Sequence, residues 1–150
     1  MSQLAEPKKE FEEYLQRNQI RFSKQRDQVL EVFLTQEGHM TVDELAIKVK
    51  ESYPEVSNAT VHRAMKLICD SGIGEGFNVG QKAMRYEHHY GHKEHDHMIC
   101  DLCGRITEFA GKELARYYEK STQAEGFTVN QHRLFVYGIC QKCNQSPHSH

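Results

Sequence analysis

Two Cys-x-x-Cys pairs constrain what this chain can fold into more than any other feature of its sequence. The first pair is Cys100 and Cys103, and the second is Cys140 and Cys143. Four thiolates are the ligand set of a closed tetrahedral zinc site, and a two-residue gap lets each pair bind the metal from one tight turn. The alternatives are two disulfides or a redox-active Cys-x-x-Cys. Because no secretory segment is recognisable at the N-terminus, the sequence favours structural zinc.

The composition limits the size of the core and the class of protein. A chain of 150 residues can form one ordinary domain or two small ones. Hydrophobic residues make up 38% and Trp is missing, so a bound metal would matter for stability. No run approaches the ~20 apolar residues of a membrane helix, and we expect a cytoplasmic protein. The formal net charge of −2 argues against a generally basic nucleic-acid coat but allows a local DNA-binding patch.

The first half of the chain is predicted to be a winged helix-turn-helix domain. Apolar periodicity and capping residues predict helices over residues 8–17, 24–34, 41–53 and 58–71, with Ser23, Thr41 and Ser57 as N-caps. Two short extended runs around Gly80 then predict a β-hairpin. In such a domain the last of three helices enters the major groove of DNA. Many proteins with three such helices do not bind DNA.

The fourth predicted helix carries the residues that would read DNA. They are small or hydrogen-bonding and lie at its start and outer side, as a base-reading surface requires; an ordinary solvated helix face is the alternative. These residues are Asn58, Ala59, Thr60, His62 and Arg63.

The second half is predicted to be a small α/β domain clamped by zinc, which makes the whole chain α+β. Strands are expected on both sides of the first Cys-x-x-Cys turn, followed by a helix over 112–125 and a long strand over 127–137. The predicted domains are therefore 1–87 for DNA binding and 95–150 for dimerisation and metal binding. Residues 88–94 would form the hinge between them, and the tail 144–150 is expected to be disordered.

A second metal site is predicted from donors that the zinc site leaves over. His95 and His97 share one face of a strand, and Glu108 lies on the neighbouring strand. Glu87 and His39 come from the first domain, where His39 by itself could be an ordinary surface loop residue. Mixed imidazole and carboxylate donors suit Fe(II), Mn(II), Zn(II) or Co(II). An ion held by both domains would fix the angle between them.

Six motifs in this order resemble the ferric uptake regulator (Fur) family over roughly residues 10–143. They are SKQRDQVLEVF, HMTVDEL, SNATVHRAM, RYE, HDHMICDLCGRITEF and HRLFVYGICQKC. The resemblance implies a homodimeric, metal-responsive repressor of palindromic double-stranded DNA. It implies structural zinc on the four cysteines, a regulatory metal on His39, Glu87, His95, His97 and Glu108, and DNA contacts from Arg26, Ala59, Thr60, His62 and Arg63. Arg21 belongs to the basic set that would contact phosphates.

The chain departs from the family pattern in two places. His62 stands where the family usually has Tyr, so the base preference could differ. A further family metal site would here consist of Glu94, Asp96, His132 and, in place of a missing glutamate, Glu113. We expect that third site to be weak or absent.

The glutamates at positions 87 and 108 resemble the iron sensors of the family, so the resemblance favours Fe(II). Peroxide sensors tend to carry aspartates there, and zinc sensors tend to add a cysteine, a role that Cys69 does not fill. A peroxide-sensing or zinc-sensing repressor is the alternative.

Two other classes of protein compete with a repressor. A histidine-rich site could activate water in a metal-dependent enzyme, but the sequence shows no nucleophile–base pair or cofactor loop, and we expect no enzyme. The histidine-rich segments could instead buffer zinc.

Overall fold

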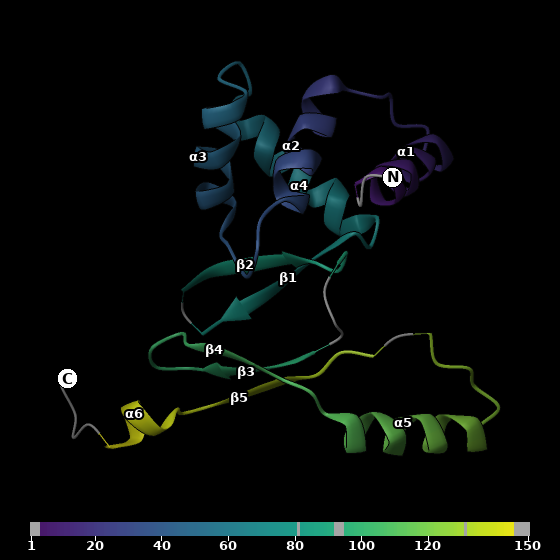
Figure 1. Cartoon of the computed structure of the whole chain (residues 1–150), viewed down its shortest axis with the longest axis vertical. Coiled ribbons are helices and arrows are strands. Elements are labelled where there is room, and N and C mark those ends of the chain that lie inside the picture. Colours follow the sequence, from purple (N-terminus) through teal and green to yellow (C-terminus); the bar gives the residue numbers. More distant parts are fainter. Residues whose placement is uncertain (1–3, 81, 92–94, 131, 146–150) are drawn as a thin grey trace. The chain divides into compact units, whose positions relative to one another are not determined.

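The computed structural model describes residues 4–80, 82–91, 95–130 and 132–145 (Figure 1). The chain divides into two compact units. One unit comprises Met1–Asn78 and Ala83–His92, and the other comprises Val79–Lys82 and Lys93–His150. In the parts that the structure describes, no helix has both the length and the apolar character needed to cross a bilayer.

The first unit confirms the predicted winged helix-turn-helix. Its described part holds four helices, and the strands β1 and β2 follow as a two-stranded sheet. The elements are α1 (Ala5–Arg17), α2 (Lys24–Leu34), α3 (Val42–Ser52), α4 (Asn58–Asp70), β1 (Gly74–Val79) and β2 (Lys82–His88).

The helix starts follow the local sequence, with one exception. Thr41 and Glu44 form a complete capping box at the start of α3, and the Ser57 hydroxyl accepts from the Thr60 N–H at 3.2 Å. Ser23 occupies the N-cap of α2 with an extended backbone, but its side chain makes no capping hydrogen bond. Ser23 therefore stands at the predicted N-cap position, but the capping hydrogen bond expected from its side chain is not made.

The core of the first unit lies between the helices, with side chains from α2, α3 and α4 at its centre. Phe33, Leu30, Leu45, Met65 and Ile68 are among its largest fully buried side chains. Phe11 and Leu15 of α1 join the same cluster. Burial of these apolar side chains supplies most of the free energy that holds the helices together.

A network of side-chain hydrogen bonds links α1 to the rest of the first unit. The ammonium of Lys8 donates to Glu31 at 2.6 Å and to Asp27 at 3.2 Å. The Tyr53 hydroxyl donates to the other oxygen of Glu31 at 2.8 Å. The hydrogen bonds from Lys8 and Tyr53 lower the pKa of the Glu31 carboxyl.

Replacement of Glu31 by Gln will test this network. Because the Glu31 side chain is 38% exposed, we expect a loss of about 0.5–1 kcal/mol in the free energy of unfolding at pH 7. Its folded-state pKa lies below the ordinary value of 4.5, so the difference from wild type should shrink as the pH falls below that value. Urea unfolding at pH 7 and at a pH below 4.5 measures this difference in the free energy of unfolding. The control Glu13→Gln, which loses an exposed ion pair with Lys9, should be as stable as wild type. A free energy of unfolding for Glu31→Gln equal to that of wild type would contradict the network.

The segment predicted as a hinge begins inside the first unit. The Nε2 of His88 lies 2.8 Å from the carbonyl oxygen of Gln36, and its ring meets Phe33 edge-on. The Tyr90 hydroxyl donates to the Glu10 carboxylate in α1. His88 and Tyr90 are thus held by this unit, whereas residues 92–94 lie outside the described residues.

The second unit is built on a three-stranded sheet with β3 in the middle (Figure 1). β3 pairs antiparallel with β4 and parallel with β5. The elements are β3 (Asp96–Cys100), β4 (Ile106–Phe109), α5 (Lys112–Ala124), β5 (Phe135–Gly138) and α6 (Gln141–Gln145). The fold class is the predicted α+β.

Two details of the second unit differ from the prediction. The long strand expected over 127–137 is confined to β5, because its pairing with β3 begins only where the His97 N–H donates to the carbonyl of Leu134 at 3.0 Å. Residues 144 and 145, expected in a disordered tail, end the short helix α6. The rest of that tail lies outside the described residues.

Candidate metal and DNA-binding sites

The four cysteines of the two Cys-x-x-Cys pairs converge in the second unit. Their sulfur atoms all lie within 4.8 Å of one another. Cys103 Sγ and Cys140 Sγ are 3.7 Å apart, and all four thiols are free. Zinc–sulfur bonds of about 2.3 Å place the sulfurs of a tetrahedral site about 3.8 Å apart. The cluster therefore fits structural zinc better than either disulfides or a redox pair.

The sheet brings the two pairs together. The parallel register of β3 and β5 places Cys100 opposite Gly138, so that Cys140 follows directly beside it. Gly104 closes the first turn with a φ of 71°, a conformation that glycine adopts without strain, and its N–H donates to the carbonyl of Cys100.

Hydrogen bonds tune the thiols for metal binding. The backbone N–H of Cys140 donates to Cys100 Sγ at 3.3 Å. This hydrogen bond and those from Cys103 and Leu102 lower the pKa of Cys100 to about 6, so a thiolate is present at neutral pH. Hydrogen bonds with Cys103 and Cys140 raise the pKa of Cys143 to about 12. A divalent cation among the four sulfurs would deprotonate this last thiol as well.

The predicted regulatory ligands form two groups, one in each unit. In the first unit, His39 Nε2 lies 3.0 Å from Glu87 Oε2, and both side chains are largely buried. The backbone bridge between Met40 and Tyr86 aligns the two residues. The ring of His39 also meets Phe77 edge-on. His39 is therefore not a freely exposed loop residue.

The second unit holds the other group on the adjacent strands β3 and β4 and at His95, the residue just before β3. His95 Nε2 lies 3.6 Å from Glu108 Oε1, and the rings of His95 and His97 are 4.8 Å apart. The antiparallel register places His97 opposite Glu108. The His97 ring, 3% exposed as a residue, stacks on Phe135 with an interplanar angle of 11°. Each group thus presents imidazole and carboxylate donors that are already close together.

The predicted third site is only partly assembled. Asp96 is buried and its Oδ1 accepts from the Leu134 N–H at 3.2 Å, while His132 Nε2 lies 3.9 Å away. Within the described ranges, no third His, Cys, Asp or Glu comes close enough to share an ion with these two. Glu113 is exposed in the first turn of α5, and Glu94 lies outside the described residues. Whether an ion binds at this third site stays a prediction.

The predicted DNA-reading residues share the exposed side of α4. Asn58, Ala59, His62 and Arg63 are exposed and Thr60 is half-buried, whereas the opposite side of the helix enters the core. The guanidinium of Arg26 donates to the carbonyl of Arg21 at 2.7 Å, at the start of α2. The helix-turn-helix thus presents a polar face of the kind that fits a major groove.

The family model of the ferric uptake regulator family matches residues 17–137 of this chain, which include both metal clusters and the winged helix. The chain belongs to the ferric uptake regulator family. It is accordingly a metal-responsive DNA-binding repressor that acts as a homodimer, as the six motifs implied.

Individual relatives of this Fur-family chain agree with the assignment. The peroxide operon regulator of Bacillus subtilis is 30% identical over 137 residues, which are 91% of this chain and 93% of that one. The crystal structure of the Campylobacter jejuni peroxide stress regulator has 32% identity and a TM-score of 0.62, over 79% of this chain and 88% of that one. The Helicobacter pylori ferric uptake regulator covers 95% of each chain with a TM-score of 0.72 and 22% identity, which supports the fold.

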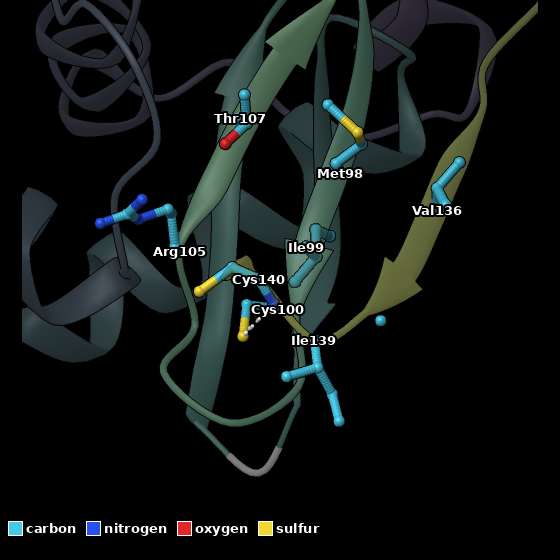
Figure 2. A pocket seen from close by; sticks show the side chains of 9 residues that line it. Met98, Ile99, Cys100, Arg105, Thr107, Val136, Ile139 and Cys140 are labelled. Atoms are coloured by element: carbon cyan, nitrogen blue, oxygen red, sulfur yellow. Dashed lines mark hydrogen bonds between the residues drawn. The ribbon is translucent and has the colours of Figure 1, made fainter. Parts of the chain in front are cut away.

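The second unit of this Fur-family chain leaves much apolar surface uncovered within one chain. A cavity of about 360 Å³ opens on its sheet between Met98, Val136 and Ile139, with Arg105 and Thr107 at its side (Figure 2). Tyr117 and Phe127 are exposed as well, and α5 buries none of its residues. An apolar surface of this extent in the dimerisation unit is what a second copy would cover.

Replacement of Val136 by Glu will test whether this sheet face pairs the two copies. A charge inside an apolar interface is left desolvated, so we expect the dimer dissociation constant to rise at least about a hundredfold. Sedimentation at graded concentrations measures the dissociation constant. Ile47→Glu, at an apolar residue 63% exposed in α3, is the control and should leave the dimer intact. An unchanged dimer in Val136→Glu would place the interface elsewhere.

Asp43 is the residue of functional interest that the sequence did not single out. It stands in the first turn of α3, and its carboxylate lies 3.2 Å from the imidazole of His62 on α4. Only the packing of α3 against α4 brings the two together, so no local pattern could have identified the pair.

Proposed function

We propose that this chain is a cytoplasmic, Fe(II)-responsive repressor whose regulatory ion is held jointly by residues of both units. The observation that carries the proposal is the pairing of donors in each unit, His39 with Glu87 and His95 with Glu108. Each group offers only two or three protein donors. Fe(II) in imidazole and carboxylate sites commonly takes five or six, so the two groups together would fill its coordination shell.

This arrangement would couple metal binding to DNA binding through the backbone that carries the ligands. His39 lies two residues before the N-cap Thr41 of α3, and Glu87 is the penultimate residue of β2. Donors shared across the connector would restrict the angles that the first unit can adopt. In a dimer, such a restriction would hold the two copies of α4 about one DNA turn apart, as a palindromic operator requires.

Peroxide sensing is the second candidate, and the relatives favour it. The B. subtilis and C. jejuni proteins are named as peroxide regulators and are 30% and 32% identical to this chain. The glutamates at positions 87 and 108 favour iron sensing, as the resemblance implied. The two readings share the fold, the ligands and the DNA-binding face.

One titration separates the two readings. Binding to operator DNA is measured by gel shift as Fe(II), Mn(II) or Zn(II) is added, with and without hydrogen peroxide. An iron sensor will bind with Fe(II) or Mn(II) and keep binding after a brief exposure to peroxide. A peroxide sensor will lose binding in the Fe(II) form and retain it in the Mn(II) form. Operator binding that does not depend on any of the three metals would overturn the proposal.

We further propose that the chain has no enzymatic activity and does not act as a metal buffer. The relatives are regulators, and metal ligation and DNA contact are the proposed roles of the site residues. Metal analysis of saturated protein should give two ions per chain, one in each cluster. A much higher ratio would favour buffering, and metal-dependent turnover without a metal-dependent DNA shift would favour an enzyme.

A further inference from the structure

His62 and Asp43 form a contact on the outer surface of the helix-turn-helix. His62 Nε2 lies 3.2 Å from Asp43 Oδ1, although the two side chains are 54% and 85% exposed. Contacts between side chains this exposed contribute little to stability, even where both groups are charged. The contact therefore has no strong structural reason, and it sits beside Asn58 and Arg63 on the face of α4 that would meet DNA.

The contact determines which atom of the His62 ring is available to a base. An ionised carboxylate can only accept hydrogen bonds, so the nitrogen facing Asp43 must carry the hydrogen. In an uncharged imidazole the other nitrogen, Nδ1, then has a free lone pair and accepts. In the major groove, the exocyclic amines of cytosine and adenine are donors, whereas guanine O6 and thymine O4 are acceptors.

We propose that Asp43 and His62 act as a base-reading pair that selects cytosine or adenine at one position of each operator half-site. Asp43 is the positioning residue, which holds the ring and fixes its tautomer. His62 is the reading residue, which accepts from the exocyclic amine through Nδ1. This inference rests on the proposed metal-responsive repressor function and adds the chemistry of one base contact.

The test is a selection of binding sites from randomised duplex DNA by the full chain loaded with zinc and Mn(II). Wild type should disfavour guanine and thymine at one symmetric position by about fivefold or more, as a single lost base contact typically does. His62→Ala and Asp43→Ala should lose the preference at that position and keep it at all others. Asp43→Asn should retain it, because the amide oxygen accepts the same hydrogen bond.

The control variant is Asp70→Ala, which removes an exposed carboxylate paired with Lys66 at the other end of α4. It should leave the selected sequence unchanged. The negative charge of Asp43 also stabilises the N-terminal end of α3 through the helix dipole. Thermal unfolding is therefore compared for all variants. A loss of stability alone would weaken binding to every sequence without changing the preference at one position.

Three outcomes would overturn the inference. A site selected by Asp43→Ala that is identical to the wild-type site would remove the positioning role. Guanine selected at the position read by His62 would show that the ring donates rather than accepts. If the metal-loaded wild type selects no sequence at all, the proposed metal-responsive repressor function fails and the base-reading pair fails with it.

Discussion

Replacement of Cys100 by Ser will release the structural zinc, unfold the second unit and abolish the dimer. Cys100 is buried at the end of the central strand β3, and hydrogen bonds lower the pKa of its thiol to about 6. A hydroxyl is a poor zinc ligand, so three thiolates would remain around the ion. The zinc of small domains contributes about 10–16 kcal/mol of apparent binding free energy, which becomes folding free energy. A small sheet with a modest core cannot replace that contribution.

Zinc analysis, light scattering and circular dichroism measure the three expected effects. We expect the zinc content to fall to near zero, the mass to halve and the helix signal of the first unit to persist. Cys69→Ser is the matched control, since Cys69 lies in α4 and burial raises the pKa of its thiol to about 11. That variant should remain a zinc-loaded dimer. A folded, dimeric and zinc-free Cys100→Ser protein would refute the structural role of the cysteines.

Replacement of His97 by Ala should raise the metal concentration for half-maximal operator binding about tenfold or more. His97 lies opposite Glu108 and next to His95, so its loss removes one donor from the middle of the second unit's group. Losses of this size are typical when the surroundings of a metal ligand are disturbed, and loss of a ligand itself should cost at least as much. A gel shift titrated with Mn(II) measures the midpoint.

Two further variants make the His97 result interpretable. Because His97 also stacks on Phe135, its removal could disturb the sheet. Glu108→Gln changes a ligand whose side chain is 50% exposed, and it should shift the midpoint in the same direction without loss of stability. His132→Ala, outside the regulatory group, should change the midpoint less than about twofold, within the spread of surface changes. Unchanged midpoints for both His97→Ala and Glu108→Gln would contradict the metal switch.

The features that the sequence predicted well are those whose physical cause is local. The helices of the first unit follow from apolar periodicity and from capping residues such as Thr41. The structure confirms that Thr41 caps α3, with both hydrogen bonds of the capping box present. The zinc cluster follows from donor chemistry, since two cysteine pairs have few other uses. The α+β class then follows from the change in period beyond the connector.

Two of the features that the sequence did not predict depend on contacts between distant segments, and a third is too short to leave a pattern. The start of β5 is set by the Leu134 carbonyl that receives the His97 N–H, not by the alternation from residue 127 onward. The helix α6 has five residues, too few for a periodic pattern. The contact of Asp43 with His62 arises only when α3 packs against α4.

We propose that donors from both units hold one ion, and calorimetric titration of Mn(II) into the zinc-loaded dimer tests this proposal most directly. Wild type should bind one Mn(II) per chain at the regulatory site. His39→Ala and His97→Ala should each weaken it about tenfold or more, and the double variant should lose less than the product of the two effects, because residues that share one ligand are coupled. Wild-type affinity in His39→Ala, with one Mn(II) still bound, would show that the second unit holds the ion by itself and would contradict the account.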